Sequence, residues 1–473
     1  MRNEDLRIGG DRVATAERTD VTNPYTGALI GTVARGTGAD LARAIAAAAA
    51  ALAGGSQPQH ERAAVLERAG VLVEERAGDL ARCLAEEAGK PVTTARAEVA
   101  RCADTLRFSA VEARTLAGDV VPFAGSSAGA GKIGFTLLRP VGVVAAITPF
   151  NFPLNLVCHK LAPAFAAGCP VVLKPAGDTP FSAYALAQIL EDAGMRPNML
   201  SVVTGPSSEL GPVIDSAEEV AVISFTGSTE VGRGLAERNP RKKVLMELGN
   251  TTPVLVDATA DLQRAASRLA ATAFAFAGQS CISAQRVYVA RDVHNAFLDL
   301  LVPAVDALVV GDPLDAATDV GPLIRPDDRD RVVAWIAEAV ADGASVRTSG
   351  QVNPDGTLQP TVLAEVTAGM KVSAREVFGP VLAVQAVATL DEAIDLANAT
   401  PYGLQAGIFT GDLAAALSAA QRLRFGGVTV NESPTFRADQ QPYGGSGDSG
   451  NTREGPAFAV REYLESTTVI LQT

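Results

Sequence analysis

Short runs of apolar, mainly β-branched residues alternate with longer amphipathic stretches through the middle of the chain. The apolar runs have the length of buried strands: VGVVAAI (141–147), PVVLK (170–174), NMLSVV (198–203) and VAVISF (220–225). Helix-like stretches lie between them, such as TPFSAYALAQILEDAG (179–194) and STEVGRGLAERN (228–239). Because a strand–helix–strand repeat places successive strands in parallel, this pattern predicts an open parallel sheet covered by helices.

The same alternation recurs with longer connections in the second half of the chain. It runs from TPVLVDATADLQRAASRLAATAFAFAG (252–278) through VYVARDVHNAFLDLLV (287–302) to GGVTVNE (426–432). A length of 473 residues exceeds one ordinary core, since domains typically hold about 100–200 residues. We therefore predict an α/β protein with two open parallel-sheet α/β domains.

One uncharged segment, residues 140–158, has the length of a membrane span. Three prolines and two asparagines interrupt it, and these would break one helix and bury amides in lipid. The segment is therefore interpreted as a strand, a loop and a helix, with no membrane association. The first twenty residues are charged throughout and lack the apolar core of a signal peptide, which predicts a cytoplasmic protein.

Charge and cysteine usage exclude further classes of protein. The net charge of −13 argues against nucleic-acid binding, which needs clustered Lys and Arg. The five cysteines show no C-x-x-C spacing, and with only three histidines no metal site is expected. Four cysteines, Cys83, Cys102, Cys158 and Cys169, lie in apolar or helical contexts and are expected to be buried. Cys281, in GQSCISAQR, has polar neighbours and is a candidate nucleophile.

A nucleotide site is predicted at the strand ends. Two G-x-G-x-x-G matches, at 129–134 and 445–450, lack the strand–helix context that gives this pattern its meaning. The turn at Gly227 and Ser228 does join a strand to a helix, whose N-terminus favours an anion. Taken alone, this turn is better explained as an ordinary capped turn with Ser228 as N-cap. Lys174 ends a strand at the ligand-binding edge, although it could simply extend to solvent there.

Eight motifs occur in an order and spacing that resemble the aldehyde dehydrogenase superfamily. They are ITPFNFPLNLV, VVLKPA, SFTGSTEVGR, MELGN, GQSC, EVFGP, PYGL and REG. The resemblance covers the chain from about residue 20 to its end. It implies a hydrolytic, NAD(P)-dependent aldehyde dehydrogenase that acts on a small aldehyde.

The resemblance also implies the catalytic residues. Cys281 matches the nucleophile that forms a thiohemiacetal with the aldehyde. Asn151 matches the side chain that stabilises the oxyanion, although its context also suits a turn residue before proline. Glu247 matches the general base that activates water to release the acid, although an ion-paired glutamate at a strand end is the simpler alternative. Relatives that pass the acyl group to coenzyme A lack this glutamate, so a non-acylating enzyme is expected.

Further matches concern the cofactor. They are Glu376 and Phe378 for the nicotinamide ribose and ring, Lys174 and position 177 for the adenosine ribose or its phosphate, and Gly227 with Ser228 for the pyrophosphate. Gly177 stands where many NAD-preferring relatives carry glutamate, which would repel a 2′-phosphate. We therefore expect NADP or NAD, with a preference for NADP.

His159 and Arg437 are the expected substrate-binding residues. NLVCHKLAP and SPTFRADQQPYGG resemble a subgroup that includes lactaldehyde, non-phosphorylating glyceraldehyde-3-phosphate and phosphonoacetaldehyde dehydrogenases. A guanidinium suits an anionic substrate group. Alternatively, Arg437 pairs with Asp439 or a neighbouring subunit, and His159 is an ordinary helix residue.

The resemblance implies three structural units. Residues 1–120 and 140–249 would bind the dinucleotide, 250–445 would form the catalytic domain, and 121–139 with 446–473 would form an oligomerisation element. The apolar tail STTVILQT favours pairing with another subunit, so a homodimer or homotetramer is expected. Two other classes stay open: a hydrolase that pairs Cys281 with His159 or His294, and an inactive structural homologue.

Overall fold

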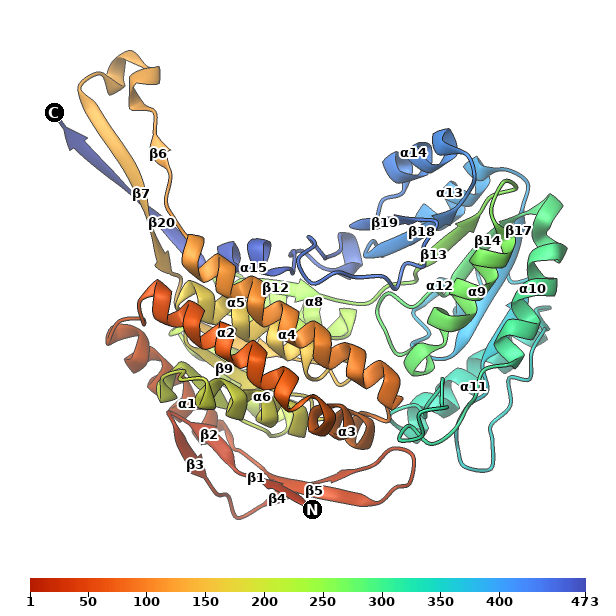
Figure 1. The fold of residues 1–473 in the computed structure, drawn as a ribbon, viewed down its shortest axis with the longest axis horizontal. Helices are drawn as coiled ribbons and strands as arrows, with labels where there is room; N and C mark the ends of the chain where they lie inside the picture. Colours follow the sequence, from red (N-terminus) through yellow and green to blue (C-terminus); the bar gives the residue numbers. More distant parts are fainter.

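A computed structural model describes residues 1–473, and two large sheets form its two lobes (Figure 1). The first sheet has seven strands in the order β12 (Lys243–Glu247), β11 (Val220–Thr226), β8 (Val143–Ile147), β9 (Val171–Lys174), β10 (Leu200–Val202), β2 (Leu6–Ile8) and β3 (Asp11–Val13). Its pairs from β12 to β10 are parallel, whereas β2 and β3 extend it as antiparallel strands. The predicted parallel sheet is confirmed.

Helices cover both faces of this sheet because its central strands are apolar on both sides. Val144 and Ala146 of β8 pack in one hydrophobic cluster, and the alternate residues Val143 and Ala145 pack in another. The first cluster lies under α2 (Gln59–Glu75), α3 (Ala77–Ala88), α4 (Val92–Thr115), α5 (Asn155–Ala167), α6 (Phe181–Asp192) and α15 (Pro456–Glu462). The second lies under α1 (Gly38–Ala53) and α7 (Ser207–Ser216), while α8 (Thr229–Arg238) packs beside β12.

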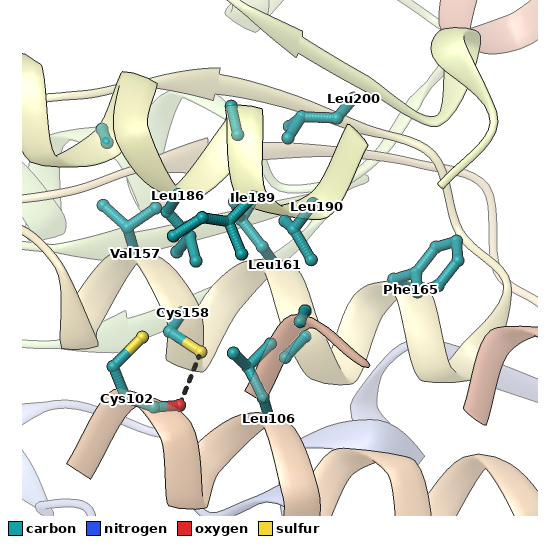
Figure 2. Close-up of a cluster of buried hydrophobic side chains, with 14 of the residues drawn as sticks. Cys102, Leu106, Val157, Cys158, Leu161, Phe165, Leu186, Ile189, Leu190 and Leu200 are labelled. Atoms are coloured by element: carbon teal, nitrogen blue, oxygen red, sulfur yellow. Dashed lines mark hydrogen bonds between the residues drawn. The ribbon is translucent and has the colours of Figure 1, made fainter. Parts of the chain in front are cut away.

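The first cluster contains most of the cysteines. Cys102 of α4 and Cys158 of α5 face each other there, and the Cys158 thiol donates a hydrogen bond to the Cys102 carbonyl at 3.6 Å (Figure 2). Cys83, Cys102, Cys158 and Cys169 are all buried and free, whereas Cys281 is partly exposed. The expected division between structural cysteines and one accessible thiol is confirmed.

The second sheet is also mostly parallel and covered by helices on both faces. Its strands run in the order β15 (Ser345–Val346), β16 (Thr361–Ala364), β17 (Val381–Val387), β14 (Arg286–Ala290), β13 (Pro253–Val256), β18 (Gln405–Phe409) and β19 (Gly427–Val430), and only β15 is antiparallel. One face packs on α9 (Leu262–Ala273), α10 (His294–Asp306), α11 (Pro326–Ala341) and α12 (Lys371–Ala374). The other packs on α13 (Leu390–Asn398) and α14 (Leu413–Arg422).

Two small sheets complete the fold. The strands β6 (Val120–Val121), β7 (Lys132–Pro140) and β20 (Leu464–Gln472) form an arm that projects from the first lobe, with the C-terminus near its tip (Figure 1). The tail strand β20 pairs with β7 of its own chain along nine residues, and its other edge ends the sheet. The strands β1 (Arg2–Glu4), β5 (Leu29–Ala34) and β4 (Arg18–Thr22) form the second small sheet.

The uncharged segment 140–158 forms the end of β7, the strand β8, a loop and the start of α5. This is the strand, loop and helix that its prolines predicted. No helix in the structure combines the length and the apolar character that crossing a bilayer requires.

Candidate active site

Several of the predicted site residues lie at the carboxyl edge of the first sheet. Lys174, Thr226 and Glu247 are the last residues of β9, β11 and β12, and Asn151 follows β8 in the loop before α5. Because neighbouring parallel strands end at the same edge, the topology gathers these side chains at the place where open α/β sheets bind ligands.

Cys281 lies in a loop between α9 and β14 that begins with unusual backbone geometry. Phe276, Ala277 and Gly278 have φ angles of 51°, 54° and 69°, three left-handed residues in succession. A Cβ at Gly278 would approach the carbonyl oxygen of Gly379 to 2.2 Å, so only glycine fits there. Left-handed backbone costs about 1–2 kcal/mol for a residue with a side chain. Surrounding contacts must therefore hold this loop in place.

The side chain of Gln279 provides several of these contacts. Its side-chain amide donates to the carbonyl of Phe276 at 3.2 Å and to that of Pro322 at 3.3 Å. Its side-chain oxygen accepts from the N–H of Ile324 at 2.9 Å. Asn151 donates from Nδ2 to the main-chain oxygen of Gln279 at 3.0 Å, which places its amide beside the loop, two residues before Cys281.

The Cys281 sulfur lies 3.0 Å from the hydroxyl oxygen of Tyr443. Burial raises the pKa of the thiol to about 12, while Tyr443 and the positive charge of Arg437 act in the opposite direction. The residue lines a cavity of about 200 Å³, together with Thr94, Ala97, Glu98, Arg101, Phe152, Asn155, Leu156, Thr272, Ala275, Phe276, Ser280, Ile282, Thr435, Arg437 and Tyr443. A small molecule in this cavity would therefore contact the thiol.

Glu247 is buried, and neither of its carboxylate oxygens has a hydrogen-bond partner. A Cβ at Gly444 would lie 2.6 Å from its Oε1, so the carboxylate faces the main chain beside Tyr443. Burial, followed by the negative charge of Glu454, raises the pKa of Glu247 well above its usual value. An unpartnered carboxylate with a raised pKa is suited to accepting a proton near neutral pH.

Glu454 anchors two buried cations near this carboxylate. Its oxygens lie 3.5 Å from Lys160 Nζ and 3.0 Å from Arg437 Nη2. Burial alone would raise the pKa of Glu454, but Lys160 and Arg437 lower it to about 2. The group is therefore charged at neutral pH and compensates both cations.

His159 and Arg437, the expected substrate-binding residues, lie side by side. His159 Nε2 lies 3.1 Å from Arg437 Nη2 and 3.0 Å from Asp439 Oδ1, and its tautomer decides whether it accepts from the guanidinium or donates to the carboxylate. Asp439 also accepts two hydrogen bonds from Arg101, at 2.9 and 3.1 Å. Arg437 lines the cavity, whereas His159 does not and lies behind Asp439 and Arg437.

The predicted adenosine end of the cofactor site is open. Lys174 is nearly buried, and this burial lowers the pKa of its ammonium group. Gly177 is exposed, and a Cβ built on it would meet no atom within 4 Å. Asp178 forms an ion pair with Arg325 at the start of α11, in the other lobe. The carboxylate beside Gly177 is therefore already bound to a cation.

The predicted pyrophosphate turn joins β11 to α8. Ser228 is the N-cap residue of α8, but its side chain caps no N–H group of the helix. The hydroxyl of Thr226 is buried without a partner. The free N–H groups at the start of α8 and the unpartnered Thr226 hydroxyl suit an anion such as a pyrophosphate.

Glu376 and Phe378 occupy the loop before β17. Glu376 Oε1 accepts from the N–H of Asn250 at 3.0 Å, and burial raises the pKa of Glu376 to about 7. A Cβ at Gly249 would come within 2.5 Å of its Oε2. Phe378 has a φ of 49°, and its ring meets that of Phe150 edge-on at 5.8 Å. The loop therefore faces the segments that follow β8 and β12.

Four residues of the site were missed in the sequence: Arg101, Lys160, Tyr443 and Glu454. Tyr443 and Glu454 lie within segments quoted for the resemblance, PYGG and REG, but nothing local distinguishes their roles. Lys160 had one visible signal, since it is a lysine inside the apolar helical stretch NLVCHKLAPAFAA. Such a lysine must find a buried acidic partner.

Comparisons with known proteins agree with this geometry. The model of the Aldehyde dehydrogenase family matches residues 12–469. The 3-sulfolactaldehyde dehydrogenase of Priestia aryabhattai is 42% identical over 467 residues, which cover 98% of this chain and 97% of that protein. The crystal structure of aldehyde dehydrogenase 21 from Physcomitrella patens, in complex with the reaction product succinate, is 36% identical with a TM-score of 0.96, covering 100% of this chain and 98% of the other. The NADP-dependent glyceraldehyde-3-phosphate dehydrogenase from Bacillus halodurans, complexed with NADP, is 32% identical with a TM-score of 0.96, and both chains are covered completely.

The buried charges around Glu454 predict a pH-dependent loss of stability. Glu454→Gln would leave Lys160 and Arg437 without their carboxylate, which should lower the free energy of unfolding by about 3–5 kcal/mol at neutral pH. The folded-state pKa of Glu454, about 2, lies below its ordinary value of 4.5. Its contribution is therefore present above pH 4.5 and is lost as the pH falls toward 2.

Thermal or denaturant unfolding of both proteins at several pH values measures this effect. The difference between wild type and variant should shrink below pH 4.5, the ordinary pKa of the group. Glu67→Gln is the matched control, because it removes an exposed partner of Arg114 and should cost no more than about 1 kcal/mol. Equal losses for the two variants would contradict the assigned role of Glu454.

Proposed function

The chain belongs to the aldehyde dehydrogenase family, and we propose that Cys281, Asn151 and Glu247 carry out its reaction. It is an NAD(P)-dependent enzyme that oxidises a small aldehyde to the carboxylic acid. One observation carries the assignment of roles: the one accessible thiol lines a cavity beside the Asn151 amide and within electrostatic reach of the unpartnered Glu247 carboxylate.

Cys281 acts as the nucleophile. Its thiolate attacks the aldehyde carbon and forms a thiohemiacetal, whose oxygen becomes negative. Asn151 Nδ2 has two N–H groups, one of which is bonded to Gln279, so the second is free to donate to this oxyanion. The main-chain N–H of Cys281 is the second donor. One such donor typically stabilises the transition state by about 2.7–4 kcal/mol.

When bound, the nicotinamide would supply the hydride acceptor, and the covalent bond to Cys281 would hold the reacting carbon for the transfer. Glu376 would hold the nicotinamide ribose and Phe378 the ring, while Lys174, Gly227 and Ser228 would hold the adenosine end. The thioester left on Cys281 is then released by water. Glu247 removes a proton from that water as the water oxygen attacks the thioester carbon; the carbon–sulfur bond then breaks and the proton returns to the Cys281 sulfur, so no coenzyme A is needed.

A hydrolase that pairs Cys281 with a histidine is not favoured. His159 Nε2 contacts Asp439 and Arg437, and His294 Nδ1 contacts its neighbour Asn295. The sulfur of Cys281 bonds to Tyr443 instead. An inactive homologue is not favoured either, because both Cys281 and Glu247 are present and face the same site.

For the cofactor, we propose NADP in preference to NAD. The open space at Gly177 admits a 2′-phosphate, and Lys174 lies at the neighbouring strand end to meet it. Asp178 would oppose the phosphate, but its charge is compensated by Arg325. A relative of the same fold is NADP-dependent and was crystallised with NADP.

For the substrate, we propose a small aldehyde with an anionic group. Two arginines, Arg101 and Arg437, line the cavity next to Cys281. Arg101 bonds Asp439 through Nε and Nη2, which leaves the donors of Nη1 for a substrate anion. Arg437 keeps an unpartnered Nε. His159 would support this group by fixing Arg437 and Asp439. The named relatives act on 3-sulfolactaldehyde and glyceraldehyde 3-phosphate, and one binds succinate; all three molecules are anionic.

The division into units is proposed with the same boundaries: 1–120 and 140–249 for the cofactor, 250–445 for catalysis, and 121–139 with 446–473 for assembly. The arm formed by β6, β7 and β20 supports the last unit, because the outer edge of β20 is a row of free main-chain groups. We propose that another subunit covers this edge in a homodimer or homotetramer. A cytoplasmic location stays a prediction from the amino-terminal composition.

Cys281→Ala tests the proposed reaction. Turnover of an aldehyde panel with NAD or NADP should be abolished, because no covalent intermediate can form, while the affinity for the cofactor stays nearly unchanged. Absorbance of the reduced nicotinamide measures the first quantity and calorimetry the second. Turnover of the variant at a rate near that of wild type would rule out the thiol mechanism.

Gly177→Glu tests the proposed cofactor preference. The added carboxylate should repel the 2′-phosphate and shift the ratio of kcat/KM from NADP toward NAD by about tenfold or more, since two charges about 4 Å apart interact by about 1–4 kcal/mol near a protein surface. Gly369→Glu is the matched control, because Gly369 is equally open but lies in the other lobe. An unchanged ratio in Gly177→Glu would show that the adenosine ribose binds elsewhere.

Arg101→Ala tests the anionic substrate. Loss of its remaining donors should raise KM for anionic aldehydes such as succinate semialdehyde about tenfold, with little change for neutral propanal and little change in kcat. Arg114→Ala, on the same helix but paired with exposed Glu67, is the control and should change neither KM. Equal effects of Arg101→Ala on charged and neutral aldehydes would exclude this role.

A further inference from the structure

We propose that Tyr443 is an additional catalytic residue, whose hydroxyl donates a hydrogen bond to the sulfur of Cys281 and stabilises the attacking thiolate. This inference rests on the proposed role of Cys281 as nucleophile. Tyr443 would then be the direct hydrogen-bond partner of the reacting sulfur.

The contact is well defined. The Tyr443 oxygen lies 3.0 Å from the sulfur, and this hydroxyl has no other hydrogen-bond partner. Either group could donate while Cys281 is a thiol. Once the thiol has lost its proton, only the hydroxyl can donate, so the bond favours the thiolate over the thiol.

A closed ring of contacts fixes the tyrosine. Its main chain exchanges two hydrogen bonds with Glu454, at 3.1 and 2.6 Å. The Glu454 carboxylate pairs with Arg437, and the Arg437 guanidinium lies 3.7 Å from the centre of the Tyr443 ring. The stacked cation orients the ring and withdraws electron density from it, which makes the hydroxyl a better donor.

The site needs such a donor. Burial raises the pKa of Cys281 to about 12, and no histidine or lysine contacts the sulfur to lower it. The hydroxyl and the cation behind it are the groups that act in favour of the thiolate. Burial also raises the pKa of Tyr443 well above 10, so the phenol keeps its proton throughout. The thiol proton leaves to water, because Cys281 is partly exposed.

Alkylation of Cys281 by iodoacetamide tests the inference without substrate or cofactor. The reaction forms a sulfur–carbon bond and releases iodide, and only the thiolate reacts, so the rate against pH shows an inflection at the pKa of the thiol. The readout is the pH of this inflection rather than the rate itself. A thiolate with a higher pKa is also more nucleophilic, so the rate at one pH would understate the shift in the pKa of Cys281. Mass spectrometry of the Cys281 peptide separates it from the buried cysteines.

Tyr443→Phe should move the inflection upward by about one pH unit, which is a tenfold smaller thiolate fraction at a given pH. Replacing Tyr443 by 3-fluorotyrosine, a more acidic phenol of almost the same size, should move it downward. Tyr184→Phe, which removes a buried hydroxyl bonded to Thr204 in the first lobe, is the matched control and should leave it in place.

An inflection that stays at the wild-type position in both Tyr443 variants would overturn the inference, even if kcat/KM fell. Should Tyr443→Phe not fold, as judged by thermal unfolding, the fluorinated protein alone decides. The two proposals also fail separately. A fully active Cys281→Ala enzyme removes the proposed reaction, whereas an inactive Cys281→Ala enzyme with an unmoved inflection in the Tyr443 variants removes only this role of Tyr443.

Discussion

Removal of water from ionisable groups between the two lobes is the constraint on which this site depends. Burial alone pushes Cys281 and Glu247 toward their neutral forms, because a charge in a poorly hydrated site is costly. For Glu247 this is useful, since a base with a raised pKa accepts a proton from water more readily. For Cys281 it is an obstacle, since the thiolate is the nucleophile. The Tyr443 hydroxyl and the positive charge of Arg437 act against that obstacle at the sulfur, whereas the negative charge of Glu454 adds to the raised pKa of Glu247.

The loop before Cys281 has a strained backbone, and contacts from both lobes stabilise it. The left-handed run from Phe276 to Gly278 abuts Gly379, next to Phe378, which is itself left-handed. Gln279 connects this loop to Asn151 of the first lobe and to Ile324 of the second. Because both lobes contact this loop, the position of Cys281 is fixed relative to the carboxyl edge of the first sheet and to the substrate cavity.

The apolar runs at 141–147 and 220–225 predicted their strands correctly, because strands buried on both faces have a plain signature in sequence. The roles of Cys281, Asn151 and Glu247 came from a resemblance, and the structure shows why local sequence could not supply them. Tyr443 lies 162 residues from Cys281, and its importance comes from one contact and one stacked cation. Likewise, the pairing of Asp178 with Arg325 joins two lobes and leaves no local pattern. The tail 466–473 was expected to pair with another subunit; in the structure one edge of β20, which contains most of this tail, is taken by β7 of the same chain.

The central claim is that the aldehyde carbon becomes attached to Cys281 and that Glu247 directs water to release it. The most direct measurement mixes the Glu247→Gln enzyme with cofactor and an anionic aldehyde, quenches the reaction with acid, and determines the mass of the Cys281 peptide. Because deacylation is slow in this variant, we expect a rapid release of about one equivalent of reduced cofactor per subunit and a Cys281 peptide heavier by the acyl group. Continued turnover at the wild-type rate with an unmodified Cys281 peptide would contradict it.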